Sequence, residues 1–217
     1  MKPRTIEIHV QALSQFIGLD RTEFADLTSF NVYRKQCIYR QRNQYISIFL
    51  DRVISNLDFS QTLHGKPYLS EIPKFAFNHS HSQKNYALSM SKQIQDLGVD
   101  IEDLDRKVRF EALAKHAFHP NEYQIWQSLD FDPSYWFKVW TTKEAILKAS
   151  GLGIRMSLNE LDTQAHPLQH GGMCQHPQLG IFAYQNYPLA HCMLSIAWRA
   201  ARSCSGFAFP EIRLIQH

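Results

Sequence analysis

The stretch Gly98-Val99-Asp100-Ile101-Glu102 decides how the rest of this sequence is read, because it alternates apolar and acidic side chains. Such alternation is typical of a β-strand with one buried face and one charged face. In a strand, residues two apart project from the same face at a separation of about 6–7 Å. Asp100 and Glu102 are therefore expected to share one face, while Val99 and Ile101 point into the core.

Two carboxylates on one face repel each other, and either protonation or a bound cation relieves this repulsion. Oxygen ligands suit a hard ion such as Mg²⁺, and Glu144 is the candidate for a third carboxylate. The alternative is that residues 100–105 are simply a solvated acidic stretch. They do not form a calcium-binding loop of the EF-hand type, because Asp105 stands at the sixth position from Asp100, where glycine is needed.

A second stretch, residues 140–148 with the sequence WTTKEAILK, carries the candidate third acid. Glu144 and Lys148 are one helical turn apart and share a face. We expect these residues at the start of a helix, where Lys143 and Lys148 would strengthen the attraction for phosphate. The alternative is a surface ion pair between Glu144 and Lys148, which would contribute a few tenths of a kcal/mol.

Length and composition favour a globular protein with a substantial core, since 44% of the 217 residues are hydrophobic. No window approaches the roughly 18 uninterrupted apolar residues of a membrane span, and the first residues lack a signal-peptide pattern, so we expect a soluble, unexported protein. The four cysteines include no Cys-x-x-Cys pair, which favours reduced thiols in a cytoplasm. The net charge of +3 favours acidic partners only weakly.

The hydrophobic pattern predicts an α+β fold of two pseudo-symmetric halves, residues 1–97 and 98–217, each a small antiparallel sheet packed on a principal helix. The first principal helix is expected within residues 31–57, from spacings of three and four. The remaining expected elements are strands at 74–80, 85–90, 180–185 and 191–198, helices from about Leu104, from Pro120 and from Thr141 or Thr142 to Gly151, and a loop over 166–176.

Four motifs stand in an order that resembles the 4′-phosphopantetheinyl transferases of the magnesium-dependent, surfactin-synthetase-activating (Sfp) type. They are Gly65-Lys66-Pro67, residues 77–82 (FNHSHS), residues 98–102 and residues 140–148. The resemblance covers the chain from about Arg42 to Gly153. It implies an active site in the cleft between the halves, with the 3′-phosphate of coenzyme A on the N-terminal side and the metal-binding strand and Lys-Glu helix on the C-terminal side.

The resemblance implies transfer of the 4′-phosphopantetheine arm of coenzyme A to a serine of an acyl, peptidyl or aryl carrier protein, with release of adenosine 3′,5′-bisphosphate. The implied Mg²⁺ ligands are Asp100, Glu102 and Glu144. Glu144 is the preferred base, ahead of His81, and Lys148 handles charge or protons. The implied contacts to coenzyme A come from Arg42 on the 3′-phosphate and from Lys66, Ser80, His81, Lys143 and Lys148.

The sequence departs from the family pattern ahead of the first long helix, where family members often place lysines that touch the nucleotide. Here Leu27 and Phe30 fall near those places, with Arg34 and Lys35 slightly later, and none of the four is included in the implied site. The expected partners are coenzyme A and acidic carrier proteins, without nucleic acid or membrane. The family type suggests a monomer that serves secondary metabolite biosynthesis.

Three other functions are compatible with parts of this sequence. A metal-dependent nuclease would also use clustered carboxylates and lysines, but no acid-x-Lys string follows the Asp100 strand. A nucleic-acid-binding module would need a basic stripe interleaved with aromatics, which the sequence lacks. A zinc site at His170, Cys174 and His176 matches no familiar ligand spacing, and a polar loop is the alternative there.

Overall fold

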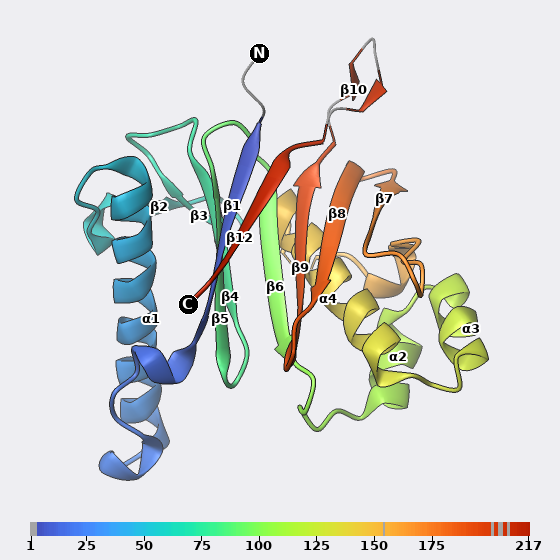
Figure 1. Cartoon of the computed structure of the whole chain (residues 1–217), viewed down its shortest axis with the longest axis horizontal. Helices are drawn as coiled ribbons and strands as arrows, with labels where there is room; N and C mark the ends of the chain where they lie inside the picture. Colours follow the sequence, from blue (N-terminus) through green and yellow to red (C-terminus); the bar gives the residue numbers. More distant parts are fainter. Residues whose placement is uncertain (1–3, 154, 201, 204–205, 208) are drawn as a thin grey trace.

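The computed structural model describes residues 4–153, 155–200, 202–203, 206–207 and 209–217, and it has an α+β fold (Figure 1). Its two main sheets each have four strands, in the orders β12-β1-β5-β4 and β6-β9-β8-β7. The strands of the first sheet are β1 (Thr5–Ala12), β4 (Ala76–His81), β5 (Asn85–Ser91) and β12 (Glu211–Gln216). Those of the second are β6 (Leu97–Asp103), β7 (Gly171–His176), β8 (Gly180–Pro188) and β9 (Cys192–Arg199).

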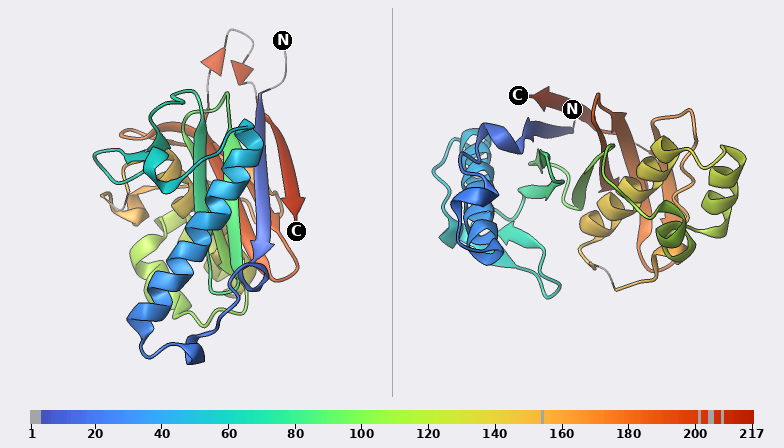
Figure 2. Two further views of the ribbon diagram at one scale, coloured as in Figure 1. Left: turned by 90° about the vertical axis from the view of Figure 1, so that its left-hand side faces the viewer. Right: turned by 90° about the horizontal axis from the view of Figure 1, so that it is seen from below.

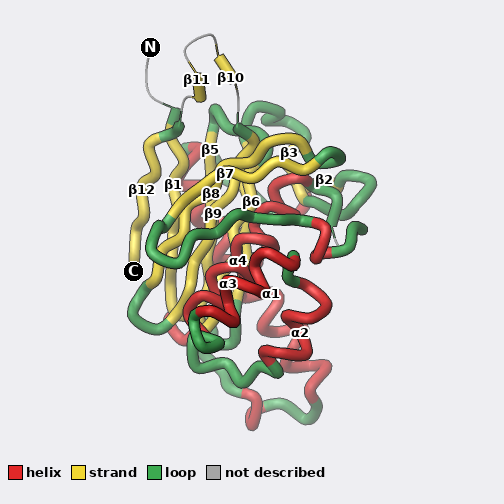
Figure 3. The backbone as a smooth tube through the Cα atoms, turned by 90° about the vertical axis from the view of Figure 1, so that its right-hand side faces the viewer, coloured by secondary structure: helices red, strands yellow, loops and turns green. Residues whose placement is uncertain are grey.

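Two small two-stranded sheets accompany them, β2 (Phe59–Gln61) with β3 (Pro67–Leu69), and β10 (Arg202–Ser203) with β11 (Gly206–Phe207). The α-helices are α1 (Leu27–Leu50), α2 (Phe110–Ala117), α3 (Pro120–Ser128) and α4 (Pro133–Ser150). The two main sheets lie between α1 at one end of the molecule and α2, α3 and α4 at the other (Figure 1), and in a side view most strands lie above and to the left of the helices (Figure 3). The described helices include none with the length and apolar character that crossing a membrane requires.

Each main sheet packs on one principal helix, as the pattern predicts, and α1 and the group of α2, α3 and α4 lie at opposite ends of the molecule (Figure 2). Ile38 and Ile46 of α1 pack with Phe77 of β4 in one buried cluster. Ala145 and Ile146 of α4 pack in another cluster that includes strands of the second sheet. The burial of these apolar faces is the main stabilising contribution to each half.

A third buried cluster joins the two halves. It contains Ile6 and Ile8 of β1 together with Val99 and Ile101 of β6 and Leu194 of β9. Val99 and Ile101 are 0% and 1% exposed, which confirms the side of the strand that was expected to face the core.

Strands β4 and β6 meet along a line that we call the seam. There the side-chain oxygen of Asn78 accepts a hydrogen bond from the backbone N–H of Val99 at 2.9 Å. Gly98 allows α4 to lie directly against β6, because a Cβ at this position would be 2.1 Å from the carbonyl oxygen of Ala145. No side chain can be accommodated at that distance. The glycine therefore sets how closely the acidic strand approaches the helix that carries Glu144.

The first sheet also contains a strand from the far end of the chain. β12 pairs in parallel with β1, with Ile6 opposite Ile212 and Ile8 opposite Leu214. The other pairs of this sheet are antiparallel. The first sheet therefore contains strands from both sides of residue 97. The division of the chain into halves at this residue remains a prediction.

Several expected element bounds are wrong. α4 begins eight residues before Thr141, at Pro133, where the Asp132 carboxylate accepts hydrogen bonds from two backbone N–H groups. Thr141 and Thr142 lie inside the helix, where their hydroxyls donate to carbonyl groups one turn earlier. Other differences are that α1 runs from Leu27 to Leu50, that α2 begins at Phe110 and that residues 171–176 form β7.

Candidate functional site

Three elements bring a compact polar group together at the seam. The Asp100 Oδ1 atom of β6 accepts a hydrogen bond from the Ser80 hydroxyl of β4 at 2.8 Å. It also accepts one from the Lys148 ammonium of α4 at 2.6 Å, and that ammonium lies 2.8 Å from the Ser80 oxygen. The structure thus joins three residues that are distant in the sequence.

The second carboxylate oxygen of Asp100 has no partner. Asp100 is 5% exposed, and its Oδ2 atom is buried without a hydrogen bond from any described residue. A buried carboxylate oxygen in this state is costly unless a cation or a donor satisfies it. A cation bound at Oδ2 would therefore remove the unfavourable free energy of this unpaired oxygen.

Glu102 and Glu144 complete the acidic group. Burial raises the pKa of both carboxyls, and the negative charge of Asp100 raises each of them further. Arg106 donates to Glu102 at 2.5 Å, and the Lys148 charge counteracts part of the rise at Glu144. The three acids are therefore close enough to perturb one another, in the way that the acidic strand pattern predicts.

The chemistry of this group suits a hard divalent cation, because carboxylate oxygens are its preferred ligands. One of these oxygens, Oδ2 of Asp100, is buried and has no hydrogen-bond partner among the described residues. Within the described ranges, no three His, Cys, Asp or Glu side chains are already grouped closely enough to hold a metal ion. Lys148 and Arg106 neutralise two of the carboxylates in this arrangement. The Mg²⁺ ligand set of Asp100, Glu102 and Glu144 therefore remains a prediction.

Lys66 lies beside this group, and its side chain forms hydrogen bonds with backbone carbonyl groups. Its ammonium donates to the carbonyl oxygen of Leu97 at 3.0 Å and to that of Ala149 at 2.9 Å. Burial lowers its pKa to about 8. Lys66 thus ties the loop before β3 to the start of β6 and the end of α4.

Arg42 lies in the middle of α1, which begins at Leu27 and ends at Leu50. Its guanidinium is 4% exposed and donates to the side-chain oxygens of Asn43 and Asn56. The guanidinium carbon lies 3.8 Å from the centre of the Phe59 ring and 4.5 Å from that of Tyr39. Arg42 is therefore held among aromatic rings in this structure.

Lys143 is not brought to the acidic group. It is 0% exposed and pairs with the equally buried Glu122 of α3 at 2.8 Å. Its ammonium also donates to the carbonyl oxygens of Leu158 and Leu161. One residue along a helix turns the side chain by about 100°, which directs Lys143 into the core when Glu144 faces the seam. The expected phosphate contact of Lys143 remains a prediction, and in this structure its ammonium is paired with Glu122 instead.

A pocket of about 310 Å³ lies next to the seam, between α1 and β4. His81 lines it together with Arg34 and Lys35, two basic residues that the sequence interpretation left out. Burial and the neighbouring Arg34 charge lower the pKa of His81. The spacing of four between Arg34 and Ile38 and between Lys35 and Tyr39 could have indicated them, since it places all four on the helix side that meets β4.

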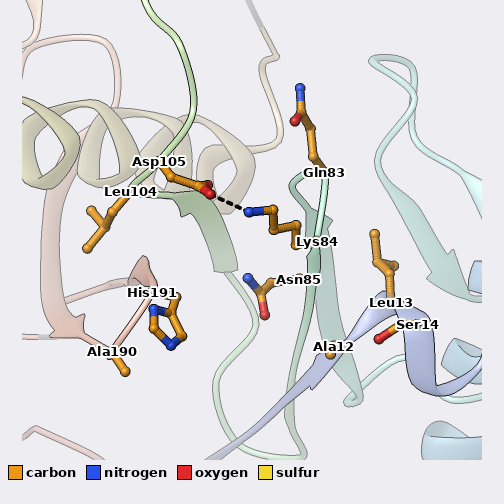
Figure 4. A pocket seen from close by; sticks show the side chains of 10 residues that line it. All are labelled: Ala12, Leu13, Ser14, Gln83, Lys84, Asn85, Leu104, Asp105, Ala190 and His191. Carbon is orange, nitrogen blue, oxygen red and sulfur yellow. Dashed lines mark hydrogen bonds and ion pairs between the residues drawn. The ribbon is translucent and has the colours of Figure 1, made fainter.

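Another pocket, of about 830 Å³, contains none of the expected site residues (Figure 4). It is lined by the end of β1, the turn between β4 and β5, the residues after β6 and the turn between β8 and β9. Its ion pair between Lys84 and Asp105 joins two exposed side chains, which contributes little. The seam, with its buried and mutually perturbed charges, is the stronger candidate for chemistry.

Comparisons with known proteins point to the same part of the chain. Residues 96–192 match the model of the 4′-phosphopantetheinyl transferase superfamily. Over 146 residues the chain is 34% identical to the 4′-phosphopantetheinyl transferase HetI of Nostoc sp., which covers 64% of this chain and 59% of that protein. It is 30% identical over 114 residues to the 4′-phosphopantetheinyl transferase Sfp of Bacillus subtilis, covering 52% of this chain and 49% of that protein.

The chain thus spans between about half and three fifths of the lengths of these relatives. Among solved structures, the holo-[acyl-carrier-protein] synthase of Thermotoga maritima aligns with a TM-score of 0.37 and 11% identity. That alignment covers 54% of this chain and 97% of the synthase.

Proposed function

We propose that this chain is a member of the 4′-phosphopantetheinyl transferase superfamily, whose model its residues 96–192 match, and that it acts as a holo-carrier-protein synthase. It transfers the 4′-phosphopantetheine arm of coenzyme A to a serine of an acyl, peptidyl or aryl carrier protein and releases adenosine 3′,5′-bisphosphate. The observation that carries this proposal is the buried group of Asp100, Ser80 and Lys148, with Glu102 and Glu144 beside it.

The donor molecule presents a pyrophosphate, and the seam offers matching hydrogen-bond donors. The Lys148 ammonium and the Ser80 hydroxyl already point at the same oxygen of Asp100. Both groups can donate to phosphate oxygens, and charge-assisted bonds of this kind are the stronger ones. Arg42 and Lys66 add positive charge on the first-half side of the same seam, and the His81 imidazole lies on that side as well.

Asp100, Glu102 and Glu144 are the residues that would hold Mg²⁺. Bound there, Mg²⁺ would offset the charge of the pyrophosphate and of the leaving bisphosphate. The unsatisfied Oδ2 atom of Asp100 supports this assignment. Gly98 supports it as well, because it holds β6 and α4 close enough for acids from both elements to interact.

Glu144 is proposed to take the proton of the carrier serine. Its raised pKa, caused by burial and by Asp100, brings the carboxylate closer to the pH at which a base works efficiently. As the proton leaves, the serine oxygen forms a bond to the phosphorus that bears the pantetheine arm. The bond from that phosphorus to the bisphosphate oxygen breaks, and the bisphosphate departs with the electron pair.

The proposed setting is a cytoplasmic monomer that meets acidic carrier proteins. The net charge of +3 is compatible with an acidic partner. Cys37, Cys174 and Cys192 are buried and unpaired, which suits a reducing compartment, while Cys204 lies outside the described residues.

The decisive experiment incubates the purified protein with coenzyme A, Mg²⁺ and a panel of apo-carrier proteins, followed by intact-protein mass spectrometry. A carrier that gains the mass of one phosphopantetheinyl group identifies the activity. Replacement of the base in Glu144→Gln is expected to reduce the transfer rate by about 10²–10⁴-fold while coenzyme A still binds.

The matched control for this variant is Glu71→Gln, which makes the same change at an exposed turn residue. It should transfer at the wild-type rate. If no carrier in the panel is modified, the proposed function fails. If Glu144→Gln turns over as fast as the control, the base assignment alone is wrong.

A further inference from the structure

We propose that Ser82 and Asp103 are a positioning pair, which holds the end of β4 against β6 so that Ser80 and Asp100 stay aligned while the donor is bound. This inference rests on the proposed function and deepens it, because neither residue of the pair is among the groups assigned to coenzyme A, to Mg²⁺ or to the transferred proton. The pair acts through the neighbouring residues of the two strands.

The two strands at the seam are joined by side chains. β4 is the edge strand of the first sheet and β6 is the edge strand of the second, and no backbone hydrogen bond connects them in the described part of the chain. Three bonds from alternate residues of β4 and the turn after it connect the strands instead, from Asn78 to the backbone of Val99, from Ser80 to Asp100 and from Ser82 to Asp103. Side chains two residues apart share one side of a strand, so all three can reach β6.

The middle bond of the three is given up when the donor binds. The Ser80 hydroxyl has one proton, which it donates to Asp100 at 2.8 Å in this structure and to a phosphate oxygen on the proposed function. The outer bonds, at Val99 and at Asp103, involve no group that the ligand takes. They can therefore keep the strands aligned after the middle bond is exchanged.

Asp103 is held by a single turn of the first half. It is 2% exposed, and its carboxylate accepts hydrogen bonds from the Ser82 hydroxyl at 2.6 Å, the Asn85 amide at 2.7 Å and the backbone N–H of Lys84 at 3.0 Å. All three donors belong to residues 82–85, which include the turn between β4 and β5. A buried carboxylate is unfavourable unless it is hydrogen-bonded, so a displacement of this turn would break several charge-assisted bonds at once. The turn therefore has one favourable position against β6.

Ser82 passes this position on to Ser80. Its hydroxyl donates to Asp103 and also accepts a hydrogen bond from the backbone N–H of Asn85 at 2.9 Å, so it closes the turn and bonds β6 at the same time. Two residues of extended backbone span only about 7 Å, and a displacement of Ser82 therefore moves Ser80 as well. A misplacement of about 1 Å that originates outside the chemistry can reduce a rate by about 10²-fold.

The test measures the Kd of coenzyme A by calorimetry in the presence of Mg²⁺, together with the KM for coenzyme A, in the wild-type protein and in Ser82→Ala. This variant leaves Asp103 bonded by Asn85 and by the backbone of Lys84, so the buried charge keeps partners and the chain folds. Both constants are expected to rise about tenfold, the usual size of one lost hydrogen bond to a charged group. Ser82→Thr keeps the hydroxyl and should restore both constants.

Ser91→Ala is the matched control. The Ser91 hydroxyl lies at the other end of β5, donates to the carbonyl oxygen of Thr5 at 2.7 Å and accepts from the backbone N–H groups of Gln93 and Ile94. Its removal should lower the midpoint of urea unfolding about as much as Ser82→Ala does, and should leave the Kd of coenzyme A unchanged. If Ser82 served folding alone, the two variants would behave alike in both measurements.

A double-mutant cycle shows whether the pair acts through Ser80. In Ser80→Ala the hydroxyl that the pair aligns is gone, so the addition of Ser82→Ala should raise the Kd by less than it does in the wild-type protein. Additive effects, an unchanged Kd in Ser82→Ala or an equal change in Ser91→Ala would overturn the positioning role and leave the transferase activity standing. If no carrier is modified but Ser82→Ala alone weakens the binding of coenzyme A, the proposed function fails and the positioning pair stands.

Discussion

The imidazole of His79 lies between the rings of Tyr39 and Tyr86, where α1 meets β4. Burial lowers its pKa to about 3 from the ordinary value of 6.5, and the positive charge of Arg42 lowers it further in the same direction. Because folding holds this residue in its neutral form, a proton taken up at low pH favours the unfolded chain. A single side chain therefore makes the packing of α1 sensitive to acid.

The stability should consequently fall between pH 6.5 and pH 3. In this window the unfolded chain binds a proton at His79 that the folded protein does not, so the free energy of unfolding decreases as the pH decreases. His79→Phe removes the titrating group, and urea unfolding at several pH values should show a shallower decline for it. His116→Phe, at an exposed position of α2, is the control. Equal slopes for wild type and His79→Phe would contradict the assignment.

At the scale of elements, one buried ion pair joins α3, α4 and the segment that follows α4. Glu122 accepts hydrogen bonds from both the backbone and the hydroxyl of Thr163, and Lys143 bonds the carbonyl oxygens of Leu158 and Leu161. Both charged side chains are 1% exposed. Removal of one partner leaves the other charge buried and unpaired, which is strongly unfavourable.

Lys143→Met should therefore lower the free energy of unfolding by about 3–5 kcal/mol. The double variant with Glu122→Leu should lose less than the sum of the two single variants, because no unpaired charge remains. Chemical denaturation measures both. The KM for coenzyme A should stay at its wild-type value in Lys143→Met; a tenfold increase without a loss of stability would instead support the phosphate contact that the family resemblance implies.

At the scale of the whole molecule, the two halves share a core and a sheet. The cluster around Ile8, Val99 and Leu194 draws on strands of both sheets, and β12 returns from the end of the chain to pair with β1. Neither half can bury its apolar face without the other. The halves should therefore unfold together.

A single transition is expected in thermal unfolding. The four tryptophans all lie after residue 97, so their fluorescence reports the second half, while far-ultraviolet circular dichroism reports both. The two midpoints should coincide, and Leu194→Ala should shift both equally, with a loss of about 2–5 kcal/mol for a fully buried leucine. Two separate midpoints would show that the halves are independent domains.

The local sequence pattern was sufficient to predict those elements that depend only on residues close together in the sequence. The alternation at 98–102 fixes which side chains of β6 are buried, and Pro120 marks the first turn of α3. The start of α4 was missed because the pattern of Trp140 to Lys148 is only the later part of a longer helix. β7 was missed because its Gly- and His-containing sequence has little strand propensity, and its pairing with β8 stabilises it.

By itself the sequence determined the acidic face of β6, the shared face of Glu144 and Lys148, and the order of motifs that resembles the transferase family. Backbone periodicity and spacing are properties of neighbouring residues, so they can be read without the fold. Only the tertiary structure decided that Ser80 and Lys148 meet at Asp100, that Lys143 turns into the core, and that Arg34 and Lys35 line a pocket with His81. Those outcomes depend on which element packs against which, and the burial of apolar surface from the whole chain determines that packing.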